Sequence, residues 1–125
     1  MASLESGASV NRAPIPKRRS KPRRGRVYDP DFMDFCHRTF GCQVARSGGC
    51  DGPNTFHHVK AGPGWPKDDT RGLMLCFGHH EAQGLPNSIE NLGKRKFELA
   101  HGIDSEERIA QNQREYEATG GVLAE

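Results

Sequence analysis

Three cysteines and one histidine form two close pairs along the chain that could together hold a metal ion. Seven residues separate Cys42 from Cys50, and Cys76 precedes His79 by three positions. Thiolates and imidazoles arranged in two pairs, which a hairpin brings together, are the usual ligands of tetrahedral Zn²⁺. The spacing therefore predicts a structural zinc site at these four residues. The alternative is a set of buried cysteines without a metal.

Two histidine doublets, His57-His58 and His79-His80, could add catalytic chemistry. Adjacent side chains on a strand point to opposite faces, so His57 and His58 should have different roles. Neighbours on a helix differ by about 100°, which lets His79 complete the zinc site while His80 faces elsewhere. One histidine of each doublet could bind a divalent cation, and the other strand histidine could accept a proton from water. Solvated loop histidines or a second structural zinc site are the alternatives.

Helices and a hairpin must position these side chains. Asp29-Pro30 is typical of a helix start, because Asp caps the first turn and Pro fits its first position. Similar signals recur later, with Asp104 and Glu107 at the start of the last helix and glycines at its end. The pattern of caps, periodicity and breakers predicts a helix over 30–40, a hairpin of strands over 55–59 and 73–75, a helix over 89–100, and a helix over 105–119.

The composition suggests that burial alone does not hold the domain together. Only 34% of the chain is hydrophobic, and 15 of its 125 residues are glycine, so a bound metal would compensate for a thin core. Cysteines in a secreted protein could instead form disulfides. The start of the chain, however, lacks the apolar run of a signal peptide, and no segment has the roughly 18 apolar residues of a membrane helix. We therefore expect a cytoplasmic protein with metal-binding cysteines and no membrane partner.

The net charge of +2 conceals a strongly basic first segment. Residues 1–26 hold eight of the 18 Lys and Arg residues and a single acidic residue. Rich in proline and poor in large apolar side chains, residues 1–27 are predicted to form a disordered arm, followed by one domain over 28–120. Such an arm could bind nucleic-acid phosphates, or it could only improve solubility. The candidate phosphate-binding residues are Arg18, Arg19, Lys21, Arg23, Arg24 and Arg26.

Taken together, these motifs resemble a known family. The segment from Cys42 to His80, with its Phe56-His57-His58-Val59 strand and its Leu75-Cys76-Phe77-Gly78-His79-His80 helix start, resembles the HNH nucleases of the His-Me finger, or ββα-metal, class. It is most similar to the phage group of recombination-enhancement nucleases, in which a later "F…GID" segment also recurs; here that segment is 97–104. The resemblance spans roughly residues 29–118.

The resemblance implies a small α+β fold with a zinc-stapled ββα-metal core and flanking helices. It implies that His57 and His80 bind a catalytic divalent ion such as Mg²⁺ or Mn²⁺, and that His58 is the general base. In the same way, His79 would complete the structural zinc site with Cys76. The sequence departs from the family at Gly84, where many members carry a third histidine ligand. Water or Asp69 could fill that position, but Asp69 could also orient His58 or cap a turn.

The expected activity is therefore metal-dependent hydrolysis of DNA phosphodiester bonds. No element carries the clustered base-reading side chains of a recognition helix, so low sequence specificity is expected. The likeness to phage proteins suggests a role in DNA recombination or processing, with a recombinase filament or packaging proteins as candidate partners. Two alternatives remain: a non-catalytic zinc module that binds DNA through its arm, and an accessory protein that docks a partner.

Overall fold

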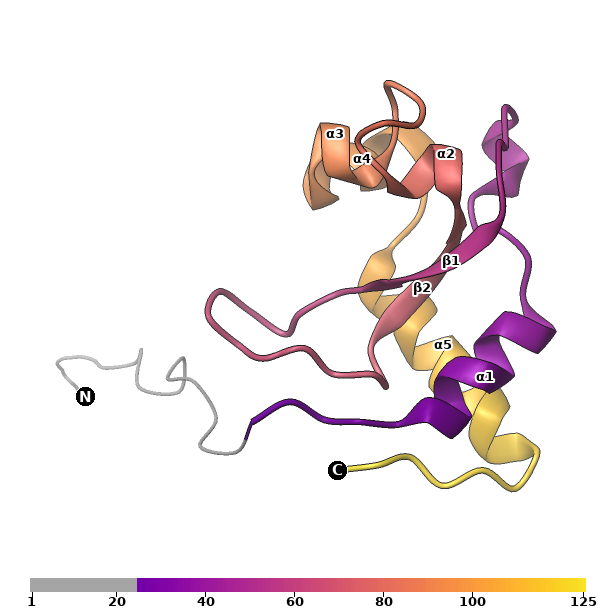
Figure 1. Ribbon diagram of the computed structural model, residues 1–125, viewed down its shortest axis with the longest axis vertical. Helices are drawn as coiled ribbons and strands as arrows, with labels where there is room; N and C mark the ends of the chain where they lie inside the picture. Colours follow the sequence, from indigo (N-terminus) through magenta and orange to yellow (C-terminus); the bar gives the residue numbers. More distant parts are fainter. Residues whose placement is uncertain (1–24) are drawn as a thin grey trace, which may run out of the picture.

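The computed structural model describes residues 25–125 and contains a two-stranded antiparallel sheet with helices around it (Figure 1). It is a small α+β fold, as predicted. The elements in chain order are α1 (Pro30–Thr39), the 3₁₀ helix η2 (Ala45–Ser47), β1 (Asn54–His58), β2 (Gly72–Cys76), α2 (Phe77–His80), α3 (Ile89–Leu92), α4 (Lys94–His101) and α5 (Ser105–Ala118).

Local signals explain where most of these helices begin. The Asp29 side chain accepts a hydrogen bond from the backbone N–H of Phe32, so α1 begins as its cap predicts. Asp104 caps α5 in the same way through the N–H of Glu107. The predicted strands also form, and Phe56 of β1 pairs with Met74 of β2. These parts of the sequence-based prediction are confirmed.

The predicted helix over 89–100 is wrong as a single helix. It is divided into α3 and α4 at Gly93, which has a φ of 82°. L-residues rarely adopt that conformation, whereas glycine does so without steric cost. After this break α4 runs to His101 and ends at Gly102, which has a left-handed conformation.

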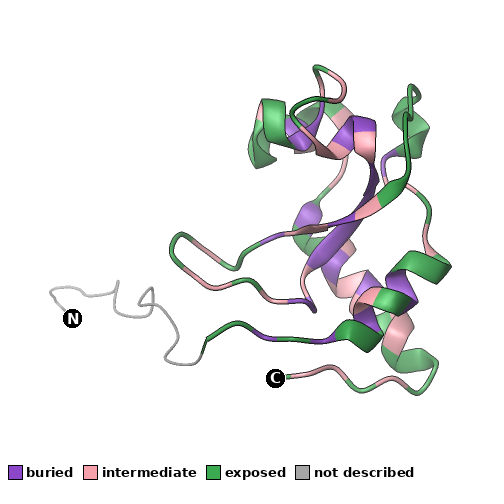
Figure 2. Cartoon of the chain, viewed as in Figure 1, coloured by how far each residue is buried: buried purple, intermediate pink, exposed green. Residues whose placement is uncertain are grey.

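The core lies on both faces of β2, in which all five residues are buried (Figure 2). Because side chains alternate along a strand, Leu73 and Leu75 face one cluster and Met74 faces the other. The first cluster also contains Val44, Val59, Ile89, Phe97 and Ile109. The second contains Phe32, Phe35, Cys36 and Phe56, so Cys36 is a core residue that lies apart from the other three cysteines. The short hairpin is thus held between two apolar layers.

Both ends of the described chain extend beyond the predicted domain limits of 28 and 120. Near the start, Val27 forms a bridge with Asp68. Near the end, the backbone N–H of Ala124 donates to the carboxylate of Asp29 at 2.8 Å. The contacts of the folded domain therefore include residues that the sequence analysis assigned to the arm or left outside.

Candidate metal centre

Cys42, Cys50, Cys76 and His79, the four predicted zinc ligands, lie together in one cluster. The Nδ1 atom of His79 is 3.6 Å from the Sγ of Cys42, 3.8 Å from that of Cys50 and 3.2 Å from that of Cys76. In a tetrahedral zinc site, bond lengths of about 2.3 Å to sulfur and 2.0 Å to nitrogen place such atoms about 3.5 Å apart. The cluster therefore has the donor set and dimensions to hold a metal ion such as Zn²⁺.

Short-range backbone contacts bring the two pairs of ligands together. The N–H groups of Phe77 and Gly78 donate to the carbonyls of Pro53 and Asp51, which holds the Cys50 loop against the start of α2. Gly52 lies in this contact with a φ of 80°, and a Cβ there would come within 2.7 Å of Phe77 Cβ. A side chain would push the loop away from the helix, so the glycine permits the close approach.

The electrostatics of the cluster favour a bound cation. Desolvation, together with the neighbouring Cys42 and Cys76 thiols, raises the pKa of Cys50 to about 12. Burial and the nearby His101 lower the pKa of His79, which keeps its ring neutral, the form that binds metal. Like-charged thiolates at this separation repel one another, and a divalent cation among them removes that repulsion.

His57 and His80 lie side by side, with ring centroids 4.8 Å apart and planes at 74°. Burial, with smaller contributions from His80 and His58, lowers the pKa of His57 to about 4. His57 is therefore neutral at pH 7, so that one ring nitrogen keeps a lone pair that can bind a metal ion. The strand and the helix start thus bring together the two histidines that the sequence analysis assigned to one divalent ion.

His58 faces a different partner from His57, as its place on the strand predicts. Its Nε2 atom is 2.8 Å from Oδ1 of Asp69, which is only 3% exposed. Because a carboxylate can only accept, Nε2–H donates to Asp69 and Nδ1 of the neutral ring keeps its lone pair. Of the roles left open for Asp69, the geometry favours orienting His58 over binding a metal.

Asp69 is itself held by two further donors. The guanidinium of Arg26 donates to Oδ1 at 3.0 Å, and the backbone N–H of Asp29 donates to Oδ2 at 3.0 Å. Although burial raises the pKa of Asp69, the hydrogen bonds from Asp29, His58 and Arg26 outweigh that effect and hold it below its usual value. Both carboxylate oxygens thus accept hydrogen bonds, which holds Asp69 in place and so fixes the orientation of the His58 ring.

Arg26 was predicted to belong to the nucleic-acid-binding arm, but in the structure it pairs with Asp69 and lies over the Tyr28 ring. The other arm residues predicted to contact phosphates lie outside the described residues: Arg18, Arg19, Lys21, Arg23 and Arg24.

A hollow of about 230 Å³ opens beside the strand histidines. His57 and His58 line it together with Lys60 and Lys94. The sequence analysis missed both lysines, because single lysines in a loop and on a helix carry no motif. Lys60 brings positive charge to the hollow, and Lys94 does so while it also pairs with Glu106 at 3.6 Å.

Two carboxylates near His80 were also missed. Glu81 Oε2 lies 3.4 Å from Nδ1 of His80, and Glu90 Oε2 lies 3.8 Å from its Nε2. The three side chains form a second group that could hold a metal ion. Glu90 lies ten residues from His80 along the chain, and only the folding of the intervening loop brings it close.

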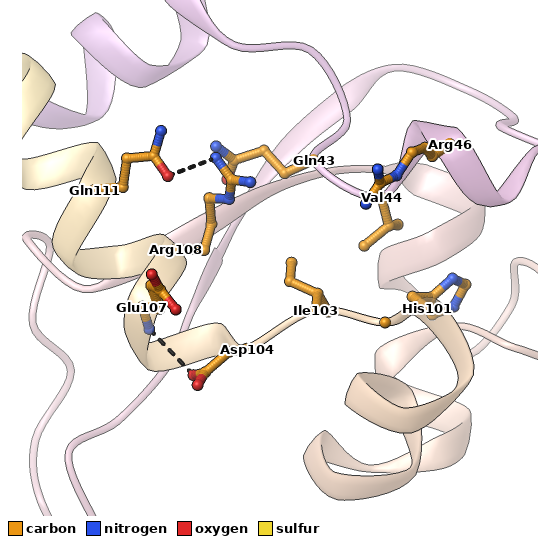
Figure 3. A pocket seen from close by; sticks show the side chains of 10 residues that line it. Gln43, Val44, Arg46, His101, Ile103, Asp104, Glu107, Arg108 and Gln111 are labelled. Atoms are coloured by element: carbon orange, nitrogen blue, oxygen red, sulfur yellow. Dashed lines mark hydrogen bonds between the residues drawn. The ribbon is translucent and has the colours of Figure 1, made fainter.

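Another hollow, of about 170 Å³, lies between α5 and the segment around η2 (Figure 3). Its lining includes Arg46, Arg108 and Gln111, and Arg108 donates to Gln111. None of the predicted site residues lines it. The chemistry of the two clusters is therefore separate from this hollow.

Within residues 25–125, no helix has the length and apolar character needed to cross a lipid bilayer. Compared with known proteins, the chain matches no family model, no curated protein and no solved structure.

Proposed function

We propose that the protein is a metal-dependent endonuclease of the ββα-metal type that hydrolyses phosphodiester bonds of DNA. The observation that carries the proposal is the pairing of His58 with buried Asp69, together with the neighbouring rings of His57 and His80 and the hollow that His57 and His58 both line. A base with a fixed ring orientation and a pair of imidazole ligands thus belong to the same strand and the helix that follows it. Hydrolysis of a phosphodiester by an activated water requires both features.

His58 supplies the base. Its Nε2–H is committed to Asp69 at 2.8 Å, so Nδ1 is the atom that accepts a proton from the attacking water. Asp69 also stabilises the charge that the ring acquires on protonation. Because Arg26 and the Asp29 N–H hold the carboxylate in place, the ring cannot rotate away without breaking its hydrogen bond to Asp69.

His57 and His80 have the donor chemistry for the divalent ion. Their rings lie 4.8 Å apart between centroids, and the lowered pKa of His57 keeps that ring ready to bind at neutral pH. A bound Mg²⁺ or Mn²⁺ would supply charge to stabilise the phosphate and the departing oxygen. The Cys42, Cys50, Cys76 and His79 cluster would hold a structural Zn²⁺ that keeps β2 and α2 in place.

Lys60 and Lys94 give the neighbouring hollow a positive charge that suits a phosphate group. The basic residues before Arg26 would add contacts to the DNA backbone. Both kinds of contact address phosphates rather than base edges, which fits low sequence specificity. The substrate would therefore be recognised by charge and shape, as expected for recombination or processing of phage DNA.

A zinc-stabilised DNA-binding module without nuclease activity is the second candidate. The observation that favours it is the closed cluster of four donors, which would stabilise the fold without any help from His58. In such a module the ring of His58 would be dispensable.

Cleavage of plasmid and single-stranded DNA, with Mg²⁺ or Mn²⁺ against EDTA, separates the two candidates. His58→Ala should lower the cleavage rate by about 10²–10⁴-fold, because a positioned base contributes about that much. His37→Ala is the matched control, since His37 is exposed on α1 and belongs to neither cluster. DNA binding without cleavage by the wild-type protein, or equal cleavage by the wild type and His58→Ala, would contradict the proposal.

A further inference from the structure

The hydrogen bonds of His80 determine which of its ring nitrogens is free. The Thr55 hydroxyl donates to the carbonyl of Leu75 at 3.1 Å and lies 2.6 Å from Nδ1 of His80. A hydroxyl has a single proton, and the carbonyl takes it, so the Thr55 oxygen accepts from Nδ1–H. In the neutral ring Nε2 therefore keeps the lone pair. That atom is available as a metal ligand.

Glu90 is the side chain that faces this nitrogen. Its Oε1 accepts a hydrogen bond from the backbone N–H of Ala82 at 3.1 Å, and its Oε2 lies 3.8 Å from Nε2 of His80. This distance is too long for a hydrogen bond, and a lone pair facing a carboxylate is unfavourable without a cation between them. An ion bound about 2.1 Å from each atom would fit between them.

The loop after α2 explains why a carboxylate from another helix reaches His80. The helix α2 ends at His80, and the chain turns back so that Gly84 packs on Gly78. A Cβ at Gly84 would lie 2.6 Å from the carbonyl oxygen of Gly78, so this position has no room for a side chain. The Asn91 amide donates to the carbonyls of Ala82 and Leu85, which fixes the loop on α3 beside Glu90.

We propose that Glu90 is a protein ligand of the divalent ion that His80 binds. This inference rests on the proposed function, because it deepens the assignment of the same site. An oxygen ligand in place of a third nitrogen makes the donor set harder and adds a negative charge. The site therefore favours Mg²⁺ or Mn²⁺ over softer ions.

The inference can be tested without DNA by titrating Mn²⁺ into the zinc-loaded full chain. Binding is measured as the decrease in the EPR signal of the free hydrated ion. Wild type should bind one Mn²⁺ per chain, and Glu90→Gln should weaken that binding by about tenfold or more, since even the partners of ligands contribute that much. Glutamine keeps the shape and the acceptor for Ala82, so the fold should persist. Glu117→Gln, at an exposed position on α5, is the matched control.

His80→Ala defines the fully impaired site, and Glu81→Gln tests the other neighbouring carboxylate. The inference is overturned if Glu90→Gln binds Mn²⁺ like the wild type, if only Glu81→Gln weakens binding, or if the wild type binds no Mn²⁺. Its failure is distinguishable from that of the proposed function. If the wild type cleaves DNA and Glu90→Gln binds Mn²⁺ normally, only the role of Glu90 as a ligand is refuted. If Glu90→Gln binds Mn²⁺ weakly but the wild type cuts no DNA, only the nuclease assignment is refuted.

Discussion

His79 and His80 are neighbours on the four-residue helix α2, but they belong to two very different clusters. His79 is fully buried, and its Nδ1 faces the three sulfur atoms of Cys42, Cys50 and Cys76. His80 is partly buried, and it faces a hydroxyl and two carboxylates whose side chains are 32% and 42% exposed. The first cluster is closed by four soft donors, while the second remains open on one side.

Under the proposed function, this difference corresponds to the difference between a structural and a catalytic metal site. A structural zinc site uses all four positions for protein ligands, whereas a catalytic site keeps a position open for water or substrate. Around His80 the donors include carboxylate oxygens. A hollow lined by His57 and His58 lies beside β1, the strand that carries these two histidines. A single turn of helix can therefore anchor the fold with one residue and present the neighbouring residue to a substrate.

The largest expected effect is the loss of the closed cluster. Cys76→Ser should remove the zinc and the cooperative unfolding transition, because structural zinc contributes about 10 kcal/mol, comparable to the whole stability of a small domain. Thermal unfolding followed by circular dichroism, with the zinc content per chain, measures both effects. Cys36→Ala is the control, since Cys36 is equally buried but lies in the second apolar cluster. If Cys76→Ser contains no zinc and still unfolds cooperatively, the structural role of the zinc site is contradicted.

A smaller effect is expected when the support of His58 is changed. Asp69→Asn removes the charge that three donors share, so we expect a loss of about 1–3 kcal/mol in stability. We also expect about tenfold slower cleavage, equivalent to about 1.4 kcal/mol in the barrier. Asp68→Asn is the control, because within residues 25–125 the Asp68 carboxylate accepts only from the backbone and hydroxyl of Thr70. Equal cleavage rates for the two folded variants would show that Asp69 does not orient the base.

The same variant has a defined pH dependence. Because the pKa of Asp69 is lowered in the fold from a usual value of 3.8, its contribution to stability is present above that value. It is lost as the pH falls through the lower folded value. The gap in stability between the wild type and Asp69→Asn should therefore be constant near neutral pH and narrow below about pH 4, as unfolding at a series of pH values would measure.

The sequence predicted those parts of the fold that depend on neighbouring residues. The caps Asp29 and Asp104 lie within three residues of the N–H groups they bind, so the starts of α1 and α5 could be predicted. The four members of the cluster that could hold a metal were predicted because two short spacings carry the signal. The helix over 89–100 was predicted as one element, since the positive φ of Gly93 depends on how α4 packs, which a local pattern does not contain.

The group around His80 and the neighbouring hollow were predicted less completely, because their other charged residues carry no motif and Glu90 and Lys94 come from later segments. Glu90, Lys60 and Lys94 are single charged residues that a sequence cannot distinguish from a solvated surface. Arg26 was assigned to the basic arm on composition, although it pairs with Asp69 across 43 positions. Such contacts depend on the path of loops, and no periodicity or cap encodes that path.

The change with the smallest expected effect on the cysteine cluster tests how independent the two clusters are. Gly84→Ala places a methyl group 2.6 Å from the carbonyl oxygen of Gly78, so the backbone must shift at a cost of about 1–3 kcal/mol. Since the loop at Gly84 positions Glu90, Mn²⁺ affinity should fall while the zinc content stays at one per chain. Gly41→Ala, with no atom within 4 Å of its Cβ, should change stability by less than about 0.5 kcal/mol. Zinc loss in Gly84→Ala would instead show that α2 couples the clusters, and that the closed site depends on the loop that shapes the open one.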